Sequence, residues 1–421
     1  MNDERLDAWI DAHFDEEVRF LQELVRVPTD TPPGDNAPHA ERTAQLLEAF
    51  GFGVERHPVP AARVAEQGMR SITNLVVRRR YGPGVTIALN AHGDVVPPGE
   101  GWTHDPYGGE IVDGRLYGRA AAVSKSDFAT YTFAARALEA CGAPSAGTVE
   151  LVFTYDEEFG GELGPGLLLA QRIIAPDFVL AAGFSYEVIT AHNGCLQMEV
   201  TVHGRMAHAA IPHTGIDALQ GAVAILDALY GCNDRYRAVR SSVPGIEHPY
   251  LNVGWIEGGT NTNVVPGKVV LRLDRRMIPE ENPADVEREV RGVIAEAAAA
   301  CPGIRVDVRR LLRADPWPPQ TANAPLVEAL QRHGAAVFGE TIPTSGTPLY
   351  TDVRLFAAAG VAAAIYGAGP RTVLESNAKR ADEHLVLEDL RRATKVVART
   401  LAELLSEPTA GGRAATPSPA S

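Results

Sequence analysis

The sequence predicts an α/β fold: a mixed sheet covered by helices on both faces, with a smaller two-layer α+β domain inserted into it. Two observations carry this prediction. The chain has 421 residues, of which 45% are hydrophobic and 22% charged, so it exceeds the size at which one core usually stops growing. Strand-like and helix-like runs alternate at both ends of the chain, and the pattern changes between residues 194 and 312.

The first part, residues 1–193, opens with an amphipathic helix, because apolar residues from Leu6 to Val25 recur at steps of three and four. A second helix is expected to end near Phe50, where Gly51 suits a left-handed C-cap. Strands then alternate with a helix, which favours a sheet covered on both faces. The expected strands are 71–79, 85–91 and 148–154, and the expected helix is 127–141.

The inserted part, residues 194–312, is predicted to be a self-contained module of two helices on a small antiparallel sheet. The α/β pattern resumes in 313–405, and the tail 406–421 is expected to be disordered because it cannot bury enough apolar surface. In the insert we expect strands at 196–203, 265–273 and 304–311 and helices at 216–230 and 283–300. After it we expect a helix at 324–338, a strand at 362–366 and a closing helix at 387–405.

Composition and charge exclude several classes of protein. The 39 Lys and Arg against 53 Asp and Glu give a net charge of −14, and the basic runs are short, so no nucleic-acid or membrane partner is expected. The apolar stretches are too short to cross a bilayer and the N-terminus lacks a signal-peptide layout, which predicts a cytoplasmic protein. The four cysteines are far apart, so neither a disulfide framework nor a thiolate zinc site is indicated.

Two predicted strands lead into titratable residues. The run 85–91 is followed by His92 and Asp94, and the run 148–154 is followed by the acidic run 156–158. Ligands of α/β sheets bind beyond the carboxyl ends of the strands, so an imidazole and carboxylates at two strand ends form a candidate site. Taken singly, each piece also fits a solvated turn or a structural hydrogen-bonded pair.

Larger motifs surround these residues. They are His92-Gly93-Asp94-Val95-Val96-Pro97, Asp113 to Arg119, Asp156-Glu157-Glu158 with Gly160-Gly161, Gly204 to His208, Gly258-Gly259 with Asn263 to Pro266, Asp274-Arg275-Arg276, Thr351-Asp352 and Asp382-Glu383. Together they resemble the dinuclear-zinc metallopeptidase family of aminoacylases, acetylornithine deacetylases and succinyl-diaminopimelate desuccinylases. The resemblance implies a hydrolase of amide-like C–N bonds that acts on a small-molecule substrate. It also implies a homodimer formed through the inserted domain.

In that family, five side chains hold two zinc ions: a His, a bridging Asp, the second Glu of the acidic run, a later acidic residue and a His near the C-terminus. His92 and Glu158 match two of these ligands. The other three positions hold Val123, Gly183 and Lys379. Catalytic zinc usually keeps three protein ligands, so we predict a degenerate or absent metal site and expect no cofactor unless other residues substitute. The conceivable substitutes are Asp127, Glu187, His192 and Glu383.

The resemblance also implies the catalytic groups. Glu157 matches the general base, and Asp94 matches the carboxylate that orients His92. Loss of zinc would remove positive charge from the site, and we expect Lys379, beside Lys125, to restore part of it. We therefore predict that Glu157 activates water while Lys379 stabilises the developing oxyanion.

Three polar residues of the inserted domain complete the predicted site. His208 and Asn263 match groups that polarise the scissile carbonyl, in the same or the partner subunit. Arg276 matches the group that grips the substrate carboxylate. With His92 and Glu158, these residues form the predicted substrate-binding set. The predicted function is a hydrolase that cleaves an amide-like C–N bond in a small carboxylate-bearing substrate.

Other interpretations stay open from the sequence. The chain could be a catalytically inactive homologue that binds a small molecule or serves as a scaffold, or a metal-dependent deacylase or peptidase with non-standard ligands. Lys125 could deprotonate Ser124 or Ser126 as a nucleophile, although loop or cap hydroxyls are the simpler interpretation. Cys195 is interpreted as a small apolar residue near the start of the insert rather than as a nucleophile.

Overall fold

The computed structural model describes residues 2–406, which fold as two compact units. The first unit takes in the chain up to Thr190, Gln320–Thr344 and the chain from Leu355 onward. The second takes in Ala191–Pro319 and Ser345–Arg354. Apart from Ser406, the tail predicted at 406–421 lies outside the described residues.

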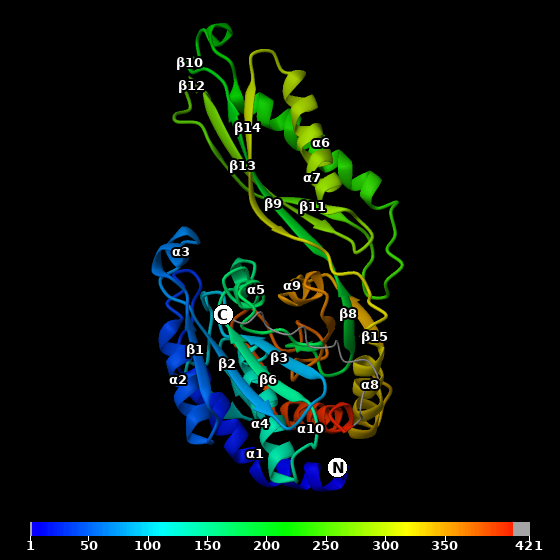
Figure 1. Ribbon diagram of the computed structural model, residues 1–421. Coiled ribbons are helices and arrows are strands. Elements are labelled where there is room, and N and C mark those ends of the chain that lie inside the picture. The colour runs from blue at the N-terminus through cyan, green and yellow to red at the C-terminus, as the bar shows by residue number, and fades with distance from the viewer. Residues whose placement is uncertain (1, 407–421) are drawn as a thin grey trace, which may run out of the picture. The chain divides into compact units, whose positions relative to one another are not determined.

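A large mixed sheet forms the centre of the first unit (Figure 1). In their order across the sheet, its strands are β1 (Val54–Pro58), β2 (Thr73–Arg80), β6 (Thr148–Thr154), β3 (Thr86–His92), β7 (Phe178–Ala181), β16 (Ala362–Ile365), β8 (Val188–His192) and β15 (Thr344–Thr347). β3 pairs in parallel with β6 and β7, whereas β2 pairs antiparallel with β6. β6 is buried along its whole length, so both faces of the sheet are covered.

Helices and a small sheet surround these strands. The helices are α1 (Asp3–Val25), α2 (Ala37–Ala49), α3 (Ala61–Glu66), α4 (Lys125–Ala140), α5 (Pro165–Ala170), α8 (Ala324–Phe338), α9 (Val353–Ala358) and α10 (Leu387–Leu404), with a 3₁₀ turn η1 (Glu157–Phe159). The small sheet consists of β4 (Glu110–Val112), β5 (Arg115–Tyr117) and β17 (His384–Val386). The predicted α/β class with a large mixed sheet is therefore confirmed.

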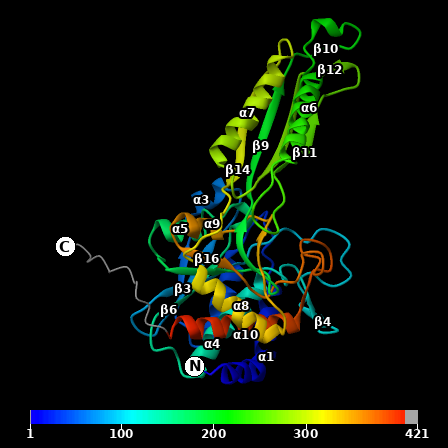
Figure 2. The same ribbon diagram turned by 90° about the vertical axis from the view of Figure 1, so that its right-hand side faces the viewer.

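Packing on α4 explains how the helical layer is held. α4 contacts β3 and β6, and α1 and α10 in turn pack against α4 (Figure 2). Phe128 of α4 stacks on Phe153 of β6 with ring centroids 4.0 Å apart. Asn2 caps the N-terminus of α1, because its side chain accepts the N–H of Glu4 at 2.8 Å, and α1 buries its apolar stripe against this layer. The helical layer is therefore packed on the sheet through a buried apolar core.

The second unit is a two-layer α+β module, as the sequence predicts. Its elements are β9 (Gly194–His203), β10 (Ala207–His208), η2 (Pro212–Thr214), α6 (Ala218–Tyr236), β11 (Tyr250–Gly258), β12 (Val264–Val265), β13 (Lys268–Met277), α7 (Pro283–Ala299) and β14 (Arg305–Ala314). The antiparallel sheet has the order β11-β13-β9-β14 and packs its apolar face on α6 and α7. The sequence did not predict β11, because this mostly exposed strand is interrupted by an irregularity between Val253 and Trp255.

The boundary of the second unit lies beyond the position chosen from the sequence. Residues 191–193 and 345–354, assigned from the sequence to the first domain, group with the second unit, and so do residues 313–319. Trp317 explains this: its N–H donates to the His192 carbonyl at 3.1 Å, and the His192 N–H donates to the Trp317 carbonyl at 3.0 Å. The role of this unit in dimerisation stays a prediction.

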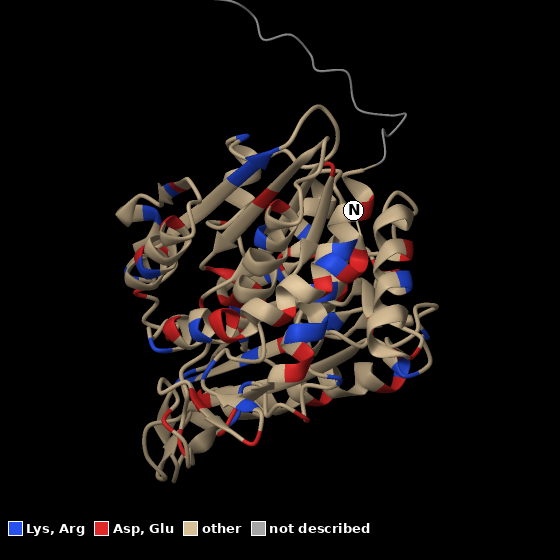
Figure 3. Ribbon diagram, turned by 90° about the horizontal axis from the view of Figure 1, so that it is seen from below, with Lys and Arg blue, Asp and Glu red and all other residues tan. Residues whose placement is uncertain are grey.

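Charged residues of both signs are interspersed along the helices, as Figure 3 shows. On one side of α1, Asp7 pairs with Arg399 at 2.6 Å and Asp11 pairs with Lys395 at 2.7 Å. These two carboxylates are therefore part of a surface of partly exposed ion pairs. Within the described part of the chain, no helix is long and apolar enough to cross a membrane.

Glu17 is buried where α1 packs against α10, and its carboxyl makes the stability of the fold depend on pH. Thr394 donates to it at 2.6 Å, and burial raises its pKa from 4.5 to about 8. The folded state keeps a proton that the unfolded chain releases, so this residue lowers stability as pH rises from 4.5 to about 8. Above that range, we expect Glu17→Gln to raise the free energy of unfolding by about 1 kcal/mol or more over wild type.

Urea unfolding at several pH values checks this expectation, with the exposed Asp15→Asn of the same helix as control. The gain in Glu17→Gln should shrink as pH falls toward 4.5, because below that pH the carboxyl is protonated in both the folded and the unfolded state. A gain that is independent of pH would contradict the assignment of a buried, neutral Glu17.

Candidate active site

The register of two parallel strands creates the candidate site. β3 and β6 pair so that His92 lies opposite Thr154, and the Gly93 N–H donates to the Thr154 carbonyl at 2.8 Å. The residues that follow the two strands, including the acidic run 156–158, therefore leave the sheet side by side. A Cβ at Gly93 would lie 2.4 Å from Cε1 of Tyr155, so the close approach of the two chains requires glycine here.

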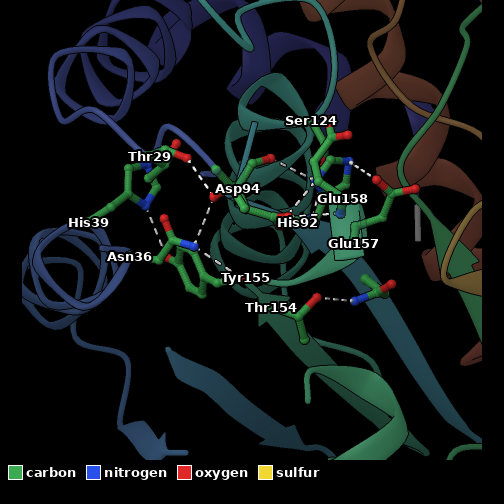
Figure 4. Close-up of polar contacts among 12 residues, drawn as sticks. Thr29, Asn36, His39, His92, Asp94, Ser124, Thr154, Tyr155, Glu157 and Glu158 are labelled. Atoms are coloured by element: carbon green, nitrogen blue, oxygen red, sulfur yellow. Dashed lines mark hydrogen bonds and ion pairs between the residues drawn. The ribbon is translucent and has the colours of Figure 1, made fainter. Parts of the chain in front are cut away.

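His92 is held on both sides of its ring. Nδ1 lies 3.0 Å from the backbone oxygen of Asp94, and Nε2 lies 3.9 Å from Oε2 of Glu157. The His92 N–H donates to the Ser124 hydroxyl oxygen at 3.0 Å (Figure 4). Burial alone would lower the pKa of His92, but the carboxylates of Glu157 and Asp94 outweigh burial and raise that pKa to about 10. The ring is therefore an imidazolium at neutral pH.

Glu157 is a carboxyl that exchanges its proton near neutral pH. Its side chain is 13% exposed. Burial raises its pKa from 4.5 to about 7; the positive charge of His92 opposes this shift and the negative charge of Glu158 adds to it. The Glu158 N–H donates to Asp94 Oδ2 at 2.9 Å, which fixes the acidic turn beside the imidazolium. A carboxylate with this pKa suits a general base.

Lys379 stands where the resemblance implies a histidine. Its Nζ donates to Glu158 Oε2 at 2.8 Å, and its side chain is 60% exposed whereas that of Glu158 is 11% exposed. Burial alone would lower the pKa of Lys379, but the charges of Glu158 and Glu157 outweigh it and raise the pKa above its ordinary value. Lys379 is therefore a permanent positive charge beside two glutamates.

Two acidic residues hold the turn that carries Lys379. Asp382 accepts from the N–H and from the hydroxyl of Thr103, both at 2.8 Å. Glu383 is buried and pairs at 2.6 Å with the fully buried Arg119, and it also accepts the Lys379 N–H at 3.3 Å. The sequence predicted no role for Arg119, whose only signal was its place in a matching motif.

Lys125 and its neighbouring serines have structural partners. Lys125 is fully buried, and its Nζ donates to the Val27 carbonyl at 3.0 Å, while burial lowers its pKa to about 7. The Ser124 hydroxyl accepts the backbone N–H of His92, and the Ser126 hydroxyl donates to the Ala122 carbonyl at 2.9 Å. These contacts do not support a serine nucleophile, and they direct the Lys125 ammonium to a backbone carbonyl. The expected position of Lys379 beside Lys125 stays a prediction.

His208, Asn263 and Arg276 belong to the second unit. His208 Nδ1 accepts the N–H of Ala210 at 3.0 Å, so a neutral ring carries its proton on Nε2. The Asn263 carbonyl accepts the N–H of the residue after His208 at 2.9 Å, which places these two residues together. Arg276 pairs with Asp274 at 2.7 Å. Of the predicted residues, the structure brings together His92, Asp94, Glu157, Glu158 and Lys379 at the strand ends. Lys125 belongs to the same unit, but its ammonium is bound by the Val27 carbonyl instead.

The residues at the implied ligand positions do not fit a pair of zinc ions. Val123 offers only an apolar side chain, and Lys379 places a positive charge on Glu158. A Cβ at Gly183 would lie 2.2 Å from Cγ2 of Ile365, so no acidic side chain fits there without movement. Among the residues that the structure describes, no three His, Cys, Asp or Glu side chains are grouped so that they could hold a metal ion.

The conceivable substitute ligands have other partners. Asp127 accepts a backbone N–H at 2.8 Å, and Glu383 is paired with Arg119 at 2.6 Å. His192 lies in the second unit, with Nδ1 at 2.8 Å from a backbone oxygen. Glu187 also interacts with another group of the protein. None of these contacts supports a non-standard dinuclear site.

The Arg119–Glu383 pair predicts a large effect on stability. Arg119→Met would leave a buried carboxylate without its partner, and we expect it to lower the free energy of unfolding by about 3 to 5 kcal/mol. Adding Glu383→Gln should recover part of this loss. Urea unfolding checks the expectation, with Arg26→Met as control because its pair with Glu23 is 49% and 35% exposed. Equal losses in the buried and exposed pairs would contradict the account.

Comparison with known proteins places this geometry in a family. Residues 88–403 match peptidase family M20/M25/M40. The chain is 29% identical over 396 residues to a succinyl-diaminopimelate desuccinylase of Acidiphilium cryptum, covering 91% of this chain and 97% of that protein. It is 32% identical over 290 residues to one of Rhizorhabdus wittichii, covering 67% and 73%.

Solved structures share the fold over nearly the whole chain. Human carnosine dipeptidase 1 superposes with a TM-score of 0.76 at 18% identity, covering 97% of this chain and 99% of that chain. The M20 family metallo-carboxypeptidase Sso-CP2 of Sulfolobus solfataricus superposes with a TM-score of 0.77 at 18% identity, covering 93% and 99%. By its sequence and its fold, this chain belongs to peptidase family M20/M25/M40.

Proposed function

We propose that this chain hydrolyses an amide-like C–N bond in a small carboxylate-bearing substrate, without the family's pair of zinc ions. The observation that carries the proposal is the set of charges at the ends of β3 and β6. Lys379 is paired with Glu158 at 2.8 Å, and the imidazolium of His92 lies 3.9 Å from Glu157. Two positive side chains thus lie beside a carboxyl that can act as a base.

Glu157 is the proposed general base. Its carboxylate takes a proton from a water molecule, whose oxygen adds to the carbonyl carbon of the substrate. The ammonium of Lys379 and the imidazolium of His92, oriented by Asp94, stabilise the negative charge that develops on the carbonyl oxygen. Glu157 then gives its proton to the amide nitrogen, the C–N bond breaks, and a carboxylic acid and an amine are released.

The second unit supplies the proposed recognition groups. Because His208 Nδ1 accepts a backbone N–H at 3.0 Å, Nε2 is the donor available to polarise the scissile carbonyl together with Asn263. Arg276 is proposed to bind the substrate carboxylate. Its guanidinium is oriented by Asp274 at 2.7 Å and by the Tyr350 ring, whose centroid lies 5.8 Å away.

The proposed substrates are N-acylated amino acids and short peptides. Relatives and structural neighbours are named as desuccinylases and dipeptidases, which supports testing N-succinyl amino acids, N-acetyl amino acids and dipeptides first. An inactive homologue would hydrolyse none of these substrates, so a measured rate of hydrolysis separates that alternative from this proposal. Activity that needs added zinc would instead favour the metal-dependent alternative.

The general base gives the most direct functional prediction. We expect Glu157→Gln to lower kcat/KM on the best substrate of this panel by about 100-fold to 10,000-fold, because an amide cannot accept the proton of water. The exposed Glu66→Gln on α3 serves as control and should leave the rate unchanged. Release of the amine is measured, and circular dichroism checks that both variants fold.

The pH dependence of kcat/KM in wild type tests the role of Glu157 in a second way. The base works when ionised, so kcat/KM should rise with pH through about 7, the pKa of Glu157. It should level off and then fall near 10, where His92 loses its positive charge. Wild-type-like turnover by Glu157→Gln, or no turnover of any panel member by wild type, would contradict the proposal.

We also propose a homodimer formed through the second unit. β11 is an edge strand of the four-stranded sheet, and it exposes Ile256 (52%) beside Trp255 (38%). On α6, which contacts β11, Leu219 (45%), Val223 (56%) and Tyr230 (46%) form an exposed apolar stripe. A two-fold related copy can pair the edge strands and cover both apolar surfaces.

The dimer predicts a change in mass in solution. Light scattering should find wild type as a dimer at micromolar concentration. Ile256→Asp combined with Val223→Glu should shift it toward the monomer, because charges would be buried in the contact. Leu374→Glu, at an apolar residue of the first unit that is 63% exposed, is the control and should leave the dimer intact. A monomeric wild type would contradict the proposal.

A further inference from the structure

Residues outside the implied ligand positions fill one side of the site. Asp127, in the first turn of α4, is fully buried, and its Oδ1 accepts the N–H of Ala368 at 2.8 Å. The backbone of Gly183 hydrogen-bonds to the same carboxyl group. A Cβ at Gly367 would lie 1.8 Å from that Oδ1. The Asp127 carboxyl therefore occupies a cradle made by the backbone just beyond β7 and β16.

Ile365 encloses the same position from another direction. It is the last residue of β16 and lies opposite Ala181 in the parallel pairing with β7. A Cβ at Gly183 would lie 2.2 Å from Cγ2 of Ile365, which is buried. The Gly369 N–H donates to the Gly183 carbonyl at 2.7 Å. Backbone and side chains thus close around Gly183, and glycine is the residue that the space allows.

We propose that Asp127 and Ile365 close the position-183 side of the site, so that restoring ligand-type side chains at 123, 183 and 379 would not restore a pair of zinc ions. The missing ligands are then only part of the change in this chain. The space that a side chain at position 183 would need is taken by Ile365, and Asp127 binds the backbone of Gly183 beside it; neither residue matches a ligand position of the family. This inference does not depend on the hydrolysis proposed above.

The direct test is zinc stoichiometry. A restored-ligand variant carries Val123→Asp, Gly183→Asp and Lys379→His, and an opened variant adds Asp127→Gly and Ile365→Ala. Each is incubated with excess zinc and dialysed, and the bound metal is measured by mass spectrometry. We expect well under one zinc per chain in the first variant and about two in the second. Two zinc ions in the restored-ligand variant, or equally little metal in both, would overturn the proposal.

A stability test covers the case in which a multiple variant does not fold. Gly183→Ala should lower the melting temperature by about 2 °C or more in wild type, because the added Cβ meets Ile365. The loss should be clearly smaller when Ile365→Ala is already present, and Gly367→Ala should behave in the same way toward Asp127→Gly. Gly53→Ala is the control, since a Cβ there would meet no atom within 4 Å. Equal losses in both backgrounds would overturn the proposed closure.

Discussion

The parallel pairing of β3 with β6 is the constraint on which the site depends. It places His92 opposite Thr154, and Asn90 strengthens it by donating to the Val152 carbonyl at 3.1 Å. A slip by one residue would turn every side chain to the other face of the sheet. The imidazole and the acidic turn meet only in the observed register, and the close contact of Gly93 with the Tyr155 ring holds the two chain segments together beyond the last paired residues.

Charge balance gives a physical reason why the remaining polar residues are compatible with one another. Two divalent ions would bring four positive charges, which the family balances with its acidic ligands. This chain lacks carboxylates at Val123 and Gly183, and it gains positive charge from Lys379 and from protonated His92, whose pKa is raised to about 10. Two lost negative charges and two gained positive charges thus offset the four that the ions would supply. A buried group of unpaired carboxylates would otherwise be costly.

Much of the fold and part of the site could be predicted from the sequence. The strand at 148–154 and the helix at 324–338 follow from local apolar patterns and agree with the structure to the residue. The replacements at Val123, Gly183 and Lys379 were visible in matching motifs. Three contacts could not be predicted, because each joins segments that only tertiary packing brings together. They are the hydrogen bond of Lys125, the buried pair of Arg119 with Glu383 and the close approach of Ile365 to Gly183.

The central claim is that side-chain charges take the place of zinc in this member of the family. Metal analysis of the purified wild-type chain, combined with the rate of amide hydrolysis before and after treatment with a strong chelator, tests it most directly. The account predicts far less than one zinc per chain and a rate that the chelator leaves unchanged. About two zinc ions per chain, with activity lost on chelation and regained on adding zinc, would contradict it.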